Sequence, residues 1–400
     1  MRTRRVTSTL MGLMLVGVAV APAHAQTIRE QQWHLDAMKV DDVWKISTGK
    51  GVTVAVIDTG VGRIPELEGQ VLPGKTFPAG DGNGDARDDY DGHGTSMAAM
   101  IAGTGSHPSG DGAYGLAPGA KILPIRVPNV LEEAATPTWV EAIRFAADSE
   151  AQIINISQGR AGSPEDDRAR AEAVKYALSK GKLIFAAVGN EGDTLNRVNY
   201  PAATPGVVGV AAVDSDGRAT KESEHGVQVD MSAPGVGIVT ACTRKTGLCT
   251  SHGTSDATAL TSASAALLWS AHPTWTNNQI LRVLLNTAGK PVDGVERNDY
   301  IGYGVVRPRV ALPTPGDPGP ADVYPLPDLA AAAAAAGTAA SGAPVPSTGG
   351  KITAPPPPRA GAAVDKGDGG GGLSWIALGL GACVLIGGAV AAVVVRRARS

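Results

Sequence analysis

Residues 52–60 read Val-Thr-Val-Ala-Val-Ile-Asp-Thr-Gly. The first six residues are apolar or β-branched and carry no charge, which is typical of a strand buried on both faces of a sheet. Asp58 ends this run and is followed by a threonine and a glycine. Because ligands bind beyond the carboxyl ends of parallel strands, we expect Asp58 to lie at a functional site.

Similar apolar runs recur along the chain and are separated by stretches with a helical pattern. The expected strands are 121–127, 153–157, 183–189 and 207–213, and the expected helices are 93–101, 139–148 and 165–179. This alternation is typical of βαβ units. The predicted fold class is therefore α/β, with a mainly parallel sheet and helices on both faces.

The composition limits the class of protein. The chain has 400 residues, a formal net charge of −3 and 18% charged residues, with a pI of about 6.2 and a mean hydropathy of zero. A dedicated nucleic-acid-binding protein would show a basic face, so this class is excluded. The charge and hydropathy fit an exported or membrane-tethered globular protein rather than a disordered one.

The first 25 residues are typical of a secretory signal peptide. Three arginines lie within the first five residues, an apolar run follows at 10–20, and Ala23-His-Ala25 offers small residues for cleavage before Gln26. The apolar run is too short to span a bilayer. We expect residues 1–25 to be removed on export.

Residues 373–395 carry no charge and are followed by Arg396, Arg397 and Arg399. A helix of this length reaches about 35 Å, enough to cross the hydrocarbon core, whereas a buried core helix would need a folded segment after it. The arginines fit the positive-inside rule. We expect a single type I membrane span at the cell membrane, with a cytoplasmic basic tail at 396–400 and the large domain, residues 26–311, outside.

The stretch 312–372 is rich in Pro, Ala and Gly and is expected to be a linker. Within it, residues 355–358 should adopt polyproline II, and the alanine run 330–336 can become helical transiently.

His93 and Ser255 lie in two further motifs that resemble parts of a catalytic site. His93 opens an expected helix in Asp91-Gly-His-Gly-Thr-Ser96, and Ser255 opens another in Ser251-His-Gly-Thr-Ser-Asp-Ala-Thr258. A hydroxyl nucleophile needs a base, and the base needs an acid that holds its tautomer. Each residue alone is equally consistent with a cap at a strand or helix end. Together, in the order Asp, His, Ser, they match the subtilisin class rather than chymotrypsin or the α/β-hydrolases.

The sequence resembles the subtilases over about residues 45–290. Ala186-Ala-Val-Gly-Asn190 is similar to the family's oxyanion segment, Asn155-Ile-Ser157-Gln158-Gly159 to its specificity-pocket strand, and Tyr200-Pro-Ala and Ser232-Ala-Pro-Gly235 to framework motifs. The resemblance implies a subtilisin-like fold and a serine endopeptidase that needs no cofactor. It also implies the catalytic residues Asp58, His93 and Ser255, the oxyanion residue Asn190, and the substrate-binding residues Ser157, Gln158 and Gly159.

Two features depart from the family's pattern. Thr258 and Ala259 stand where the serine motif usually reaches a proline, and Asp256 follows the nucleophile in place of a larger apolar residue. A carboxylate there can raise the pKa of His93 or point away into another polar contact, and the sequence leaves both alternatives open.

The domain order narrows the resemblance. About 25 residues separate Gln26 from the first strand, too few for a folded inhibitory pro-domain. A signal peptide, a short extension, a subtilase domain, a linker and one span resemble a mycosin, a membrane-anchored subtilase of type VII secretion. This implies a protein substrate and partners in the secretion complex. The alternatives are a generic surface protease and a scaffold with an idle active site.

Three further features carry expectations. Cys242 and Cys249 lie close together, and in an exported domain such a pair is expected to be bridged, whereas Cys383 falls in the expected span. The acidic stretch 81–91 resembles the start of a calcium loop, but Gly92 stands where the bidentate glutamate belongs, so we expect a solvated loop and no metal. His252 is expected in a turn at the edge of the site and not as the base.

Overall fold

The structure, a computed structural model, describes residues 26–77, 84–128 and 135–340. The expected signal peptide, membrane span and basic tail lie outside these residues, as does most of the expected linker. Over the described part of the chain, none of the helices is long and apolar enough to cross a membrane.

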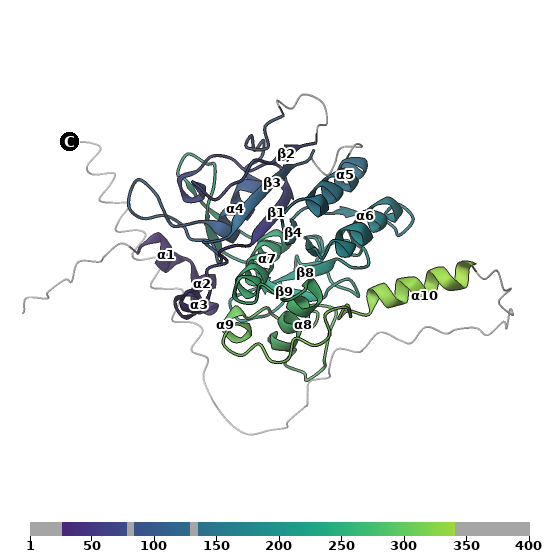
Figure 1. The fold of residues 1–400 in the computed structure, drawn as a ribbon. Coiled ribbons are helices and arrows are strands. Elements are labelled where there is room, and N and C mark those ends of the chain that lie inside the picture. Colours follow the sequence, from purple (N-terminus) through teal and green to yellow (C-terminus); the bar gives the residue numbers. More distant parts are fainter. Residues whose placement is uncertain (1–25, 78–83, 129–134, 341–400) are drawn as a thin grey trace, which may run out of the picture. The chain divides into compact units, whose positions relative to one another are not determined.

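A parallel sheet of seven strands forms the centre of the described chain (Figure 1). In spatial order the strands are β2 (Lys75–Thr76), β3 (Lys121–Arg126), β1 (Thr53–Asp58), β4 (Ile153–Ile156), β6 (Leu183–Ala187), β8 (Val208–Val213) and β9 (Met231–Pro234). Every neighbouring pair is parallel. The predicted fold class and the five predicted strands are confirmed, whereas β2 and β9 were not predicted because they are short and lack an apolar run.

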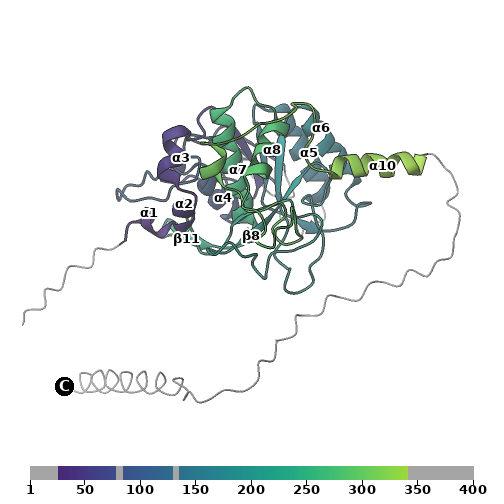
Figure 2. The same ribbon diagram turned by 90° about the horizontal axis from the view of Figure 1, so that it is seen from below.

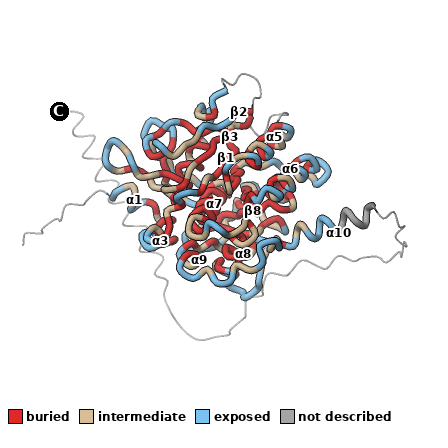
Figure 3. Tube along the Cα trace, viewed as in Figure 1, coloured by how far each residue is buried: buried red, intermediate tan, exposed pale blue. Residues whose placement is uncertain are grey.

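Helices cover both faces of the sheet. On one face lie α4 (His93–Ala102), α7 (Thr254–Ala271) and α8 (Asn277–Thr287), and on the other α5 (Ala135–Asp148) and α6 (Arg168–Ser179). Side chains alternate along β1, with Val54 and Val56 in the first core and Ala55 and Ile57 in the second. Buried residues accordingly follow the strands and α7 in Figure 3.

Helix α7 is almost entirely buried although it is rich in Ser and Thr. Its hydroxyls bond to carbonyls one turn back: Thr258 Oγ1 donates to Thr254 O (2.7 Å), Thr261 to Ala257 O and Ser264 to Leu260 O (both 2.8 Å). These bonds satisfy the buried hydroxyls within the helix. The missing family proline therefore leaves an unbroken helix that begins at Thr254, directly before Ser255.

The topology creates a crevice at the carboxyl end of β1. This strand lies between β3 and β4. From β1 the chain passes through α4 to β3 on one side, and then through α5 to β4 on the other side. Such a reversal of strand order opens a crevice where ligands bind. Asp58, the last residue of β1, lies at this point.

Three short N-terminal helices, α1 (Ile28–Gln31), α2 (Trp33–Ala37) and α3 (Val40–Ile46), lie against the domain. Gln32 Nε2 donates to Tyr114 O (2.7 Å), Trp33 Nε1 to Val236 O (3.0 Å) and Trp44 Nε1 to Leu116 O (2.9 Å). The short extension expected before the first strand is therefore bonded to distant segments of the domain.

The beginning of the expected linker also lies on the domain. After α9 (Pro308–Ala311), Arg282 Nη1 donates to Pro318 O (2.7 Å), and Leu326 is buried. Helix α10 (Asp328–Ala340) follows, extending to the right in Figure 2, and contains the alanine run. Arg282 Nη1 of α8 also donates to Pro320 O at 3.0 Å, so the first part of the proline-rich stretch is bonded to the domain.

Two short antiparallel pairs flank the sheet, along with one 3-10 turn. The strands β5 (Arg160–Ala161) and β7 (Asn199–Tyr200) form one pair, and β10 (Ile238–Ala241) and β11 (Leu248–Ser251) form the other. The turn η1 spans Pro65–Leu67. The first pair borders the site described next, and the second leads into α7.

Candidate active site

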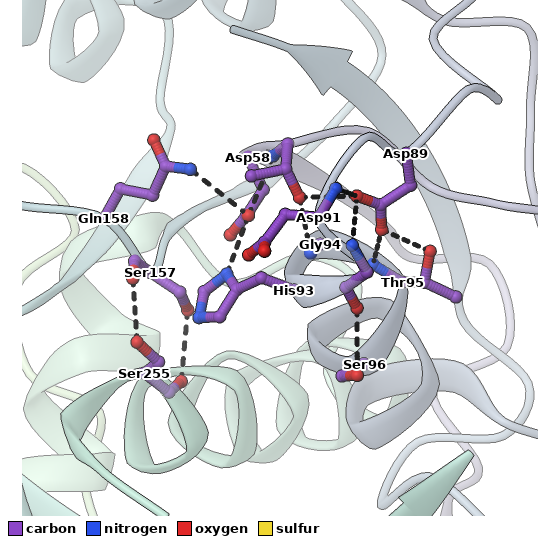
Figure 4. A network of polar contacts seen from close by, with 12 residues as sticks. Asp58, Asp89, Asp91, His93, Gly94, Thr95, Ser96, Ser157, Gln158 and Ser255 are labelled. Atoms are coloured by element: carbon purple, nitrogen blue, oxygen red, sulfur yellow. Dashed lines mark hydrogen bonds and ion pairs between the residues drawn. The ribbon is translucent and has the colours of Figure 1, made fainter. Parts of the chain in front are cut away.

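Asp58 and His93 meet at the carboxyl end of β1. The Nδ1 atom of His93, the first residue of α4, lies 2.8 Å from Oδ1 of Asp58 (Figure 4). Asp58 is fully buried, and the same oxygen accepts a hydrogen bond from Thr59 N at 2.8 Å. The close approach requires Gly94, because a Cβ there would lie 2.2 Å from Gly60 O. The carboxylate is thus placed to fix the tautomer and orientation of the imidazole.

The surroundings of His93 favour its protonated form. Burial opposes the charge, but the charge and hydrogen bond of Asp58, with the charges of Asp256 and Asp91, outweigh it and raise the pKa to about 9. An imidazole held this way is a stronger base than an isolated one.

Ser255 is the second residue of α7 and lies beside Ser157, which follows β4. Ser255 Oγ donates to Ser157 O (2.8 Å), and Ser157 Oγ donates to Ser255 O (3.1 Å). Figure 4 shows the imidazole of His93 between this serine pair and Asp58. Catalytic hydrogen bonds are often unformed without substrate. In the described structure the Ser255 hydroxyl donates to Ser157 O rather than to the imidazole of His93.

Asn190 presents an amide nitrogen to the same region. Its Oδ1 accepts hydrogen bonds from Thr254 N (2.9 Å) and Thr254 Oγ1 (3.0 Å). Since the oxygen is engaged, Nδ2 is the atom left for a ligand, and it bonds to no other residue in the described part of the chain. Gly253 allows the approach, because a Cβ there would lie 3.0 Å from Nδ2. An unengaged amide donor beside a nucleophile suits a developing oxyanion.

A pocket of about 520 Å³ adjoins Ser255 and Asn190. It is lined by residues 157 and 159–161, by 187, 189–191, 197 and 199, and by 254 and 255. Of the three residues expected to bind substrate, Ser157 and Gly159 line the pocket. Gln158 points its Nε2 toward Asp58 Oδ1 instead, at 3.4 Å (Figure 4).

Asn199 lines this pocket, and the buried residue behind it, Glu224, was not indicated by the motifs. Asn199 Nδ2 donates to Glu224 Oε1 at 2.7 Å, and Glu224 is fully buried. Burial raises the pKa of Glu224 to about 7 despite this hydrogen bond. Only the Tyr200-Pro-Ala framework motif beside Asn199 hinted at this part of the site, and nothing in the sequence near Glu224 did.

Asp256 points into the protein. It is fully buried, and its Oδ1 accepts a hydrogen bond from Ser251 Oγ at 2.9 Å, while Oδ2 bonds to no described residue. Burial raises the pKa of Asp256 to about 7. Both alternatives that the sequence left open therefore hold, because this carboxylate makes a polar contact and also raises the pKa of His93.

The remaining expected features lie around this centre. His252 lies between β11 and α7, as expected, with 70% of its side chain exposed and its Nδ1 3.0 Å from Glu222. The sulfurs of Cys242 and Cys249 are 2.06 Å apart. Part of the acidic stretch, 81–83, lies outside the described residues, and among those described no cluster of three or more His, Cys, Asp or Glu could hold a metal.

The chain is similar to known proteins in both sequence and fold. A family model described as the subtilase family matches residues 49–304. M-protease of Shouchella clausii (strain KSM-K16) is 31% identical over 264 residues, which are 66% of this chain and 65% of M-protease. The crystal structure of MycP1 from Mycobacterium smegmatis has a TM-score of 0.65 and 28% identity, covering 76% of this chain and 89% of that one.

A structure of the periplasmic assembly from the ESX-5 inner membrane complex is also similar, with a TM-score of 0.64 and 28% identity. The similarity covers 85% of this chain and 92% of that one. The family match spans more than half of the chain and includes Asp58, His93, Asn190 and Ser255. This chain therefore belongs to the subtilase family of serine proteases.

Proposed function

We propose that this protein is a serine endopeptidase that cleaves peptide bonds through an acyl-enzyme. The observation that carries the proposal is the 2.8 Å contact between Asp58 Oδ1 and His93 Nδ1, with the imidazole beside Ser255 (Figure 4). Ser255 and Asn190 line one pocket. In this proposal Ser255 attacks the scissile carbonyl, and His93 takes its proton and delivers it to the leaving amine. Asp58 orients His93 and stabilises the imidazolium.

The oxyanion is stabilised by two donors. Asn190 Nδ2 is one, because Thr254 engages the amide oxygen. The backbone N–H of Ser255 in the first turn of α7 is the other, where the helix dipole favours negative charge. Ser157, Gly159 and Asn199 line the pocket that takes the substrate side chain on the acyl side, while Gln158 supports Asp58.

The setting is part of the same proposal. The similarity to MycP1 and to the ESX-5 periplasmic assembly supports a mycosin-like protease that acts on a protein substrate at a type VII secretion complex. The catalytic domain lies outside the cytoplasm, exported by the signal peptide and anchored by residues 373–395 in the cell membrane. In that compartment Cys242 and Cys249 are bridged.

A second candidate function is structural. The similarity to the ESX-5 assembly covers 92% of that chain, so the domain's surface could serve the complex whether or not Ser255 acts. A degradative surface protease is the third possibility. It would cleave unrelated extracellular proteins, whereas a secretion protease would leave them intact.

Labelling with an active-site-directed fluorophosphonate tests the proposed chemistry. The full-length protein should form a covalent adduct that peptide mapping places on Ser255. Ser255→Ala should remove the adduct, and His93→Ala should slow its formation by orders of magnitude because the base is lost. An unlabelled protein, or an adduct on another serine, would contradict the proposed mechanism.

A further inference from the structure

Asp89 lies in the acidic stretch before α4 and is only partly exposed, whereas Asp85, Asp88 and Asp91 of the same stretch are exposed, as the sequence predicted. Its Oδ1 accepts hydrogen bonds from Thr59 Oγ1 (2.7 Å) and Gly92 N (2.8 Å). Its Oδ2 accepts hydrogen bonds from both Thr95 N (2.8 Å) and Thr95 Oγ1. Figure 4 shows these bonds beside the Asp58–His93 pair. One carboxylate thus contacts the segment after β1 and the first turn of α4.

The two threonines that Asp89 holds each bind the opposite segment. Thr59, which follows β1, accepts a hydrogen bond from Gly94 N of α4 at 2.9 Å. Thr95 of α4 accepts a hydrogen bond from Gly62 N, after β1, at 2.8 Å. Because each hydroxyl donates to Asp89, its lone pairs are turned toward these amides. The result is a two-way connection between the strand exit and the helix start.

The connection reaches the catalytic pair through covalent neighbours. Thr59 follows Asp58, and its amide donates to Asp58 Oδ1, the oxygen that contacts His93. Gly94 and Thr95 follow His93 in the first turn of α4. Their N–H groups have no partner within the helix and are satisfied by Thr59 and Asp89. The distance between Asp58 and His93 therefore depends on these bonds.

We propose that Asp89 is a positioning residue of the active site, which holds the β1 exit and the α4 start at the separation that aligns Asp58 with His93. The inference rests on the proposed protease function and extends it to a residue that does not touch substrate. Asp89 acts through its hydrogen bonds, whereas the charges that raise the pKa of His93 come from Asp58, Asp256 and Asp91.

Asp89→Asn is the direct test, with Asp91→Asn as the matched control. Asparagine offers one acceptor and turns the other side into a donor, which opposes the donors of Thr59 or Thr95. Asp91 is exposed in the same loop, and its side chain bonds to no described residue. Both variants lose one negative charge, so their difference reports the hydrogen bonds.

The expected result in the full-length protein is a fall in kcat of about 10²-fold for Asp89→Asn with KM changed less than about twofold, since misplacement of about 1 Å has this effect. Asp91→Asn should stay within about threefold of wild type in kcat. The low-field proton NMR signal of the His93 Nδ1–H should persist in Asp91→Asn and be lost in Asp89→Asn. Equal kcat in the two variants, or a retained signal in Asp89→Asn, would overturn the inference.

Variants of Thr59 keep the inference falsifiable if Asp89→Asn does not fold. Thr59→Val removes the hydroxyl with little change of shape and should reproduce the loss of kcat and of the NMR signal. Thr59→Ser retains the hydroxyl and should restore both. Identical behaviour of Val and Ser variants would refute the connection. The NMR signal needs no turnover, so an inactive wild type that still shows it would count against the proposed function and not against the role of Asp89.

Discussion

Ser157 and Ser255 exchange two hydrogen bonds, one from each hydroxyl to the other residue's carbonyl, at 3.1 and 2.8 Å. Both residues also line the pocket of about 520 Å³ beside Asn190. In the proposed mechanism the Ser255 hydroxyl must exchange its hydrogen bond to Ser157 O for one to the imidazole of His93.

Asp256→Asn should shift the pH dependence of activity to lower pH. The acyl-transfer step needs neutral His93, so kcat/KM rises as pH increases through the pKa of His93, which Asp58, Asp256 and Asp91 raise to about 9. With a pKa of about 7, Asp256 is ionised where His93 titrates. Its replacement removes a charge that favours the imidazolium, so the acid limb moves down.

The pH profile of kcat/KM checks this prediction. Asp91→Asn is the control. The charge of Asp91 has the smallest of the three effects on the pKa of His93, so its loss should move the acid limb of the profile less. An acid limb that stays in place in Asp256→Asn would show that the carboxylate does not act on His93.

The same substitution should also change stability in a pH-dependent way. The pKa of Asp256 is raised from 3.8 to about 7 by burial, so the folded state binds its proton more tightly than the unfolded state. The stability contributed by this group is present below about pH 4 and is lost as pH rises to about 7. Asp256→Asn removes the loss, so its stability relative to wild type should increase across this window.

Urea unfolding at a series of pH values measures the difference. The relative free energy of unfolding should be constant below about pH 4, rise up to about pH 7 and then level off. A difference that does not depend on pH would mean that Asp256 does not titrate in this range.

The sequence predicted the parts of this molecule that local pattern determines. The apolar run before Asp58 predicted a buried parallel strand, and the Gly-rich segments around His93 and Ser255 predicted helix starts. Fully buried Glu224 carries no such signal, because its hydrogen-bond partner Asn199 lies 25 residues away in sequence. The contacts of Asp89 carried no signal for a similar reason, since a run of acidic residues does not show which one faces two threonine hydroxyls.

Local sequence pattern also did not indicate that the segments before β1 and after α9 are bonded to the domain. Helices α1 to α3 are too short for a clear periodicity, and they are held by tryptophan and glutamine contacts with distant carbonyls. The proline-rich stretch after α9 has the composition of a linker, but Arg282 fixes it to α8. Both outcomes depend on side-chain partners that only the folded chain brings together.

His252→Ala should lower kcat/KM far less than His93→Ala. His252 is mostly exposed and pairs with Glu222, whereas His93 contacts Asp58. Loss of the base is expected to reduce kcat on the order of 10⁶-fold, and loss of His252 less than about tenfold, since exposed ion pairs contribute little. Peptide hydrolysis by the two variants compares them directly. Near-complete losses in both would reverse the assignment of the base.

Asn199→Gly should broaden the preference of the specificity pocket toward larger side chains. A Cβ at Gly159 would lie 3.5 Å from the Asn199 Cβ, and a Cβ at Gly189 would lie 2.2 Å from the Asn199 Nδ2. The Asn199 side chain therefore lies between the segments at Gly159 and Gly189 that line the pocket. Its removal deepens the pocket. The ratio of kcat/KM for phenylalanine over alanine at the residue before the scissile bond should rise about tenfold or more.

Glu224→Gln is the control for the shape of the pocket at Asn199. Glutamine has nearly the same volume and can accept the Asn199 hydrogen bond, so the side-chain preference should match wild type. If Asn199→Gly leaves the ratio of kcat/KM for phenylalanine over alanine unchanged, the Asn199 side chain does not limit the depth of the pocket.

Ser255→Ala separates proteolysis from a structural role in secretion. The substitution removes one hydroxyl at the start of α7, whose turn is held by Asn190 and Thr254 and does not depend on that hydroxyl. Peptide hydrolysis should be abolished, apart from slow turnover by the remaining oxyanion donors. Stability should change little, and the protein should still reach the membrane because the expected signal and span are untouched.

Secretion by cells that carry the type VII complex is the decisive measurement. If the domain's surface serves the complex, Ser255→Ala supports secretion while a deletion of 26–311 that keeps the signal and the span does not. We expect this split, because the similarity to the ESX-5 periplasmic assembly covers 85% of this chain, far more than the few residues of the proposed active site. Equal failure of Ser255→Ala and the deletion would show that secretion needs the cleavage itself, and the structural role would then have no support.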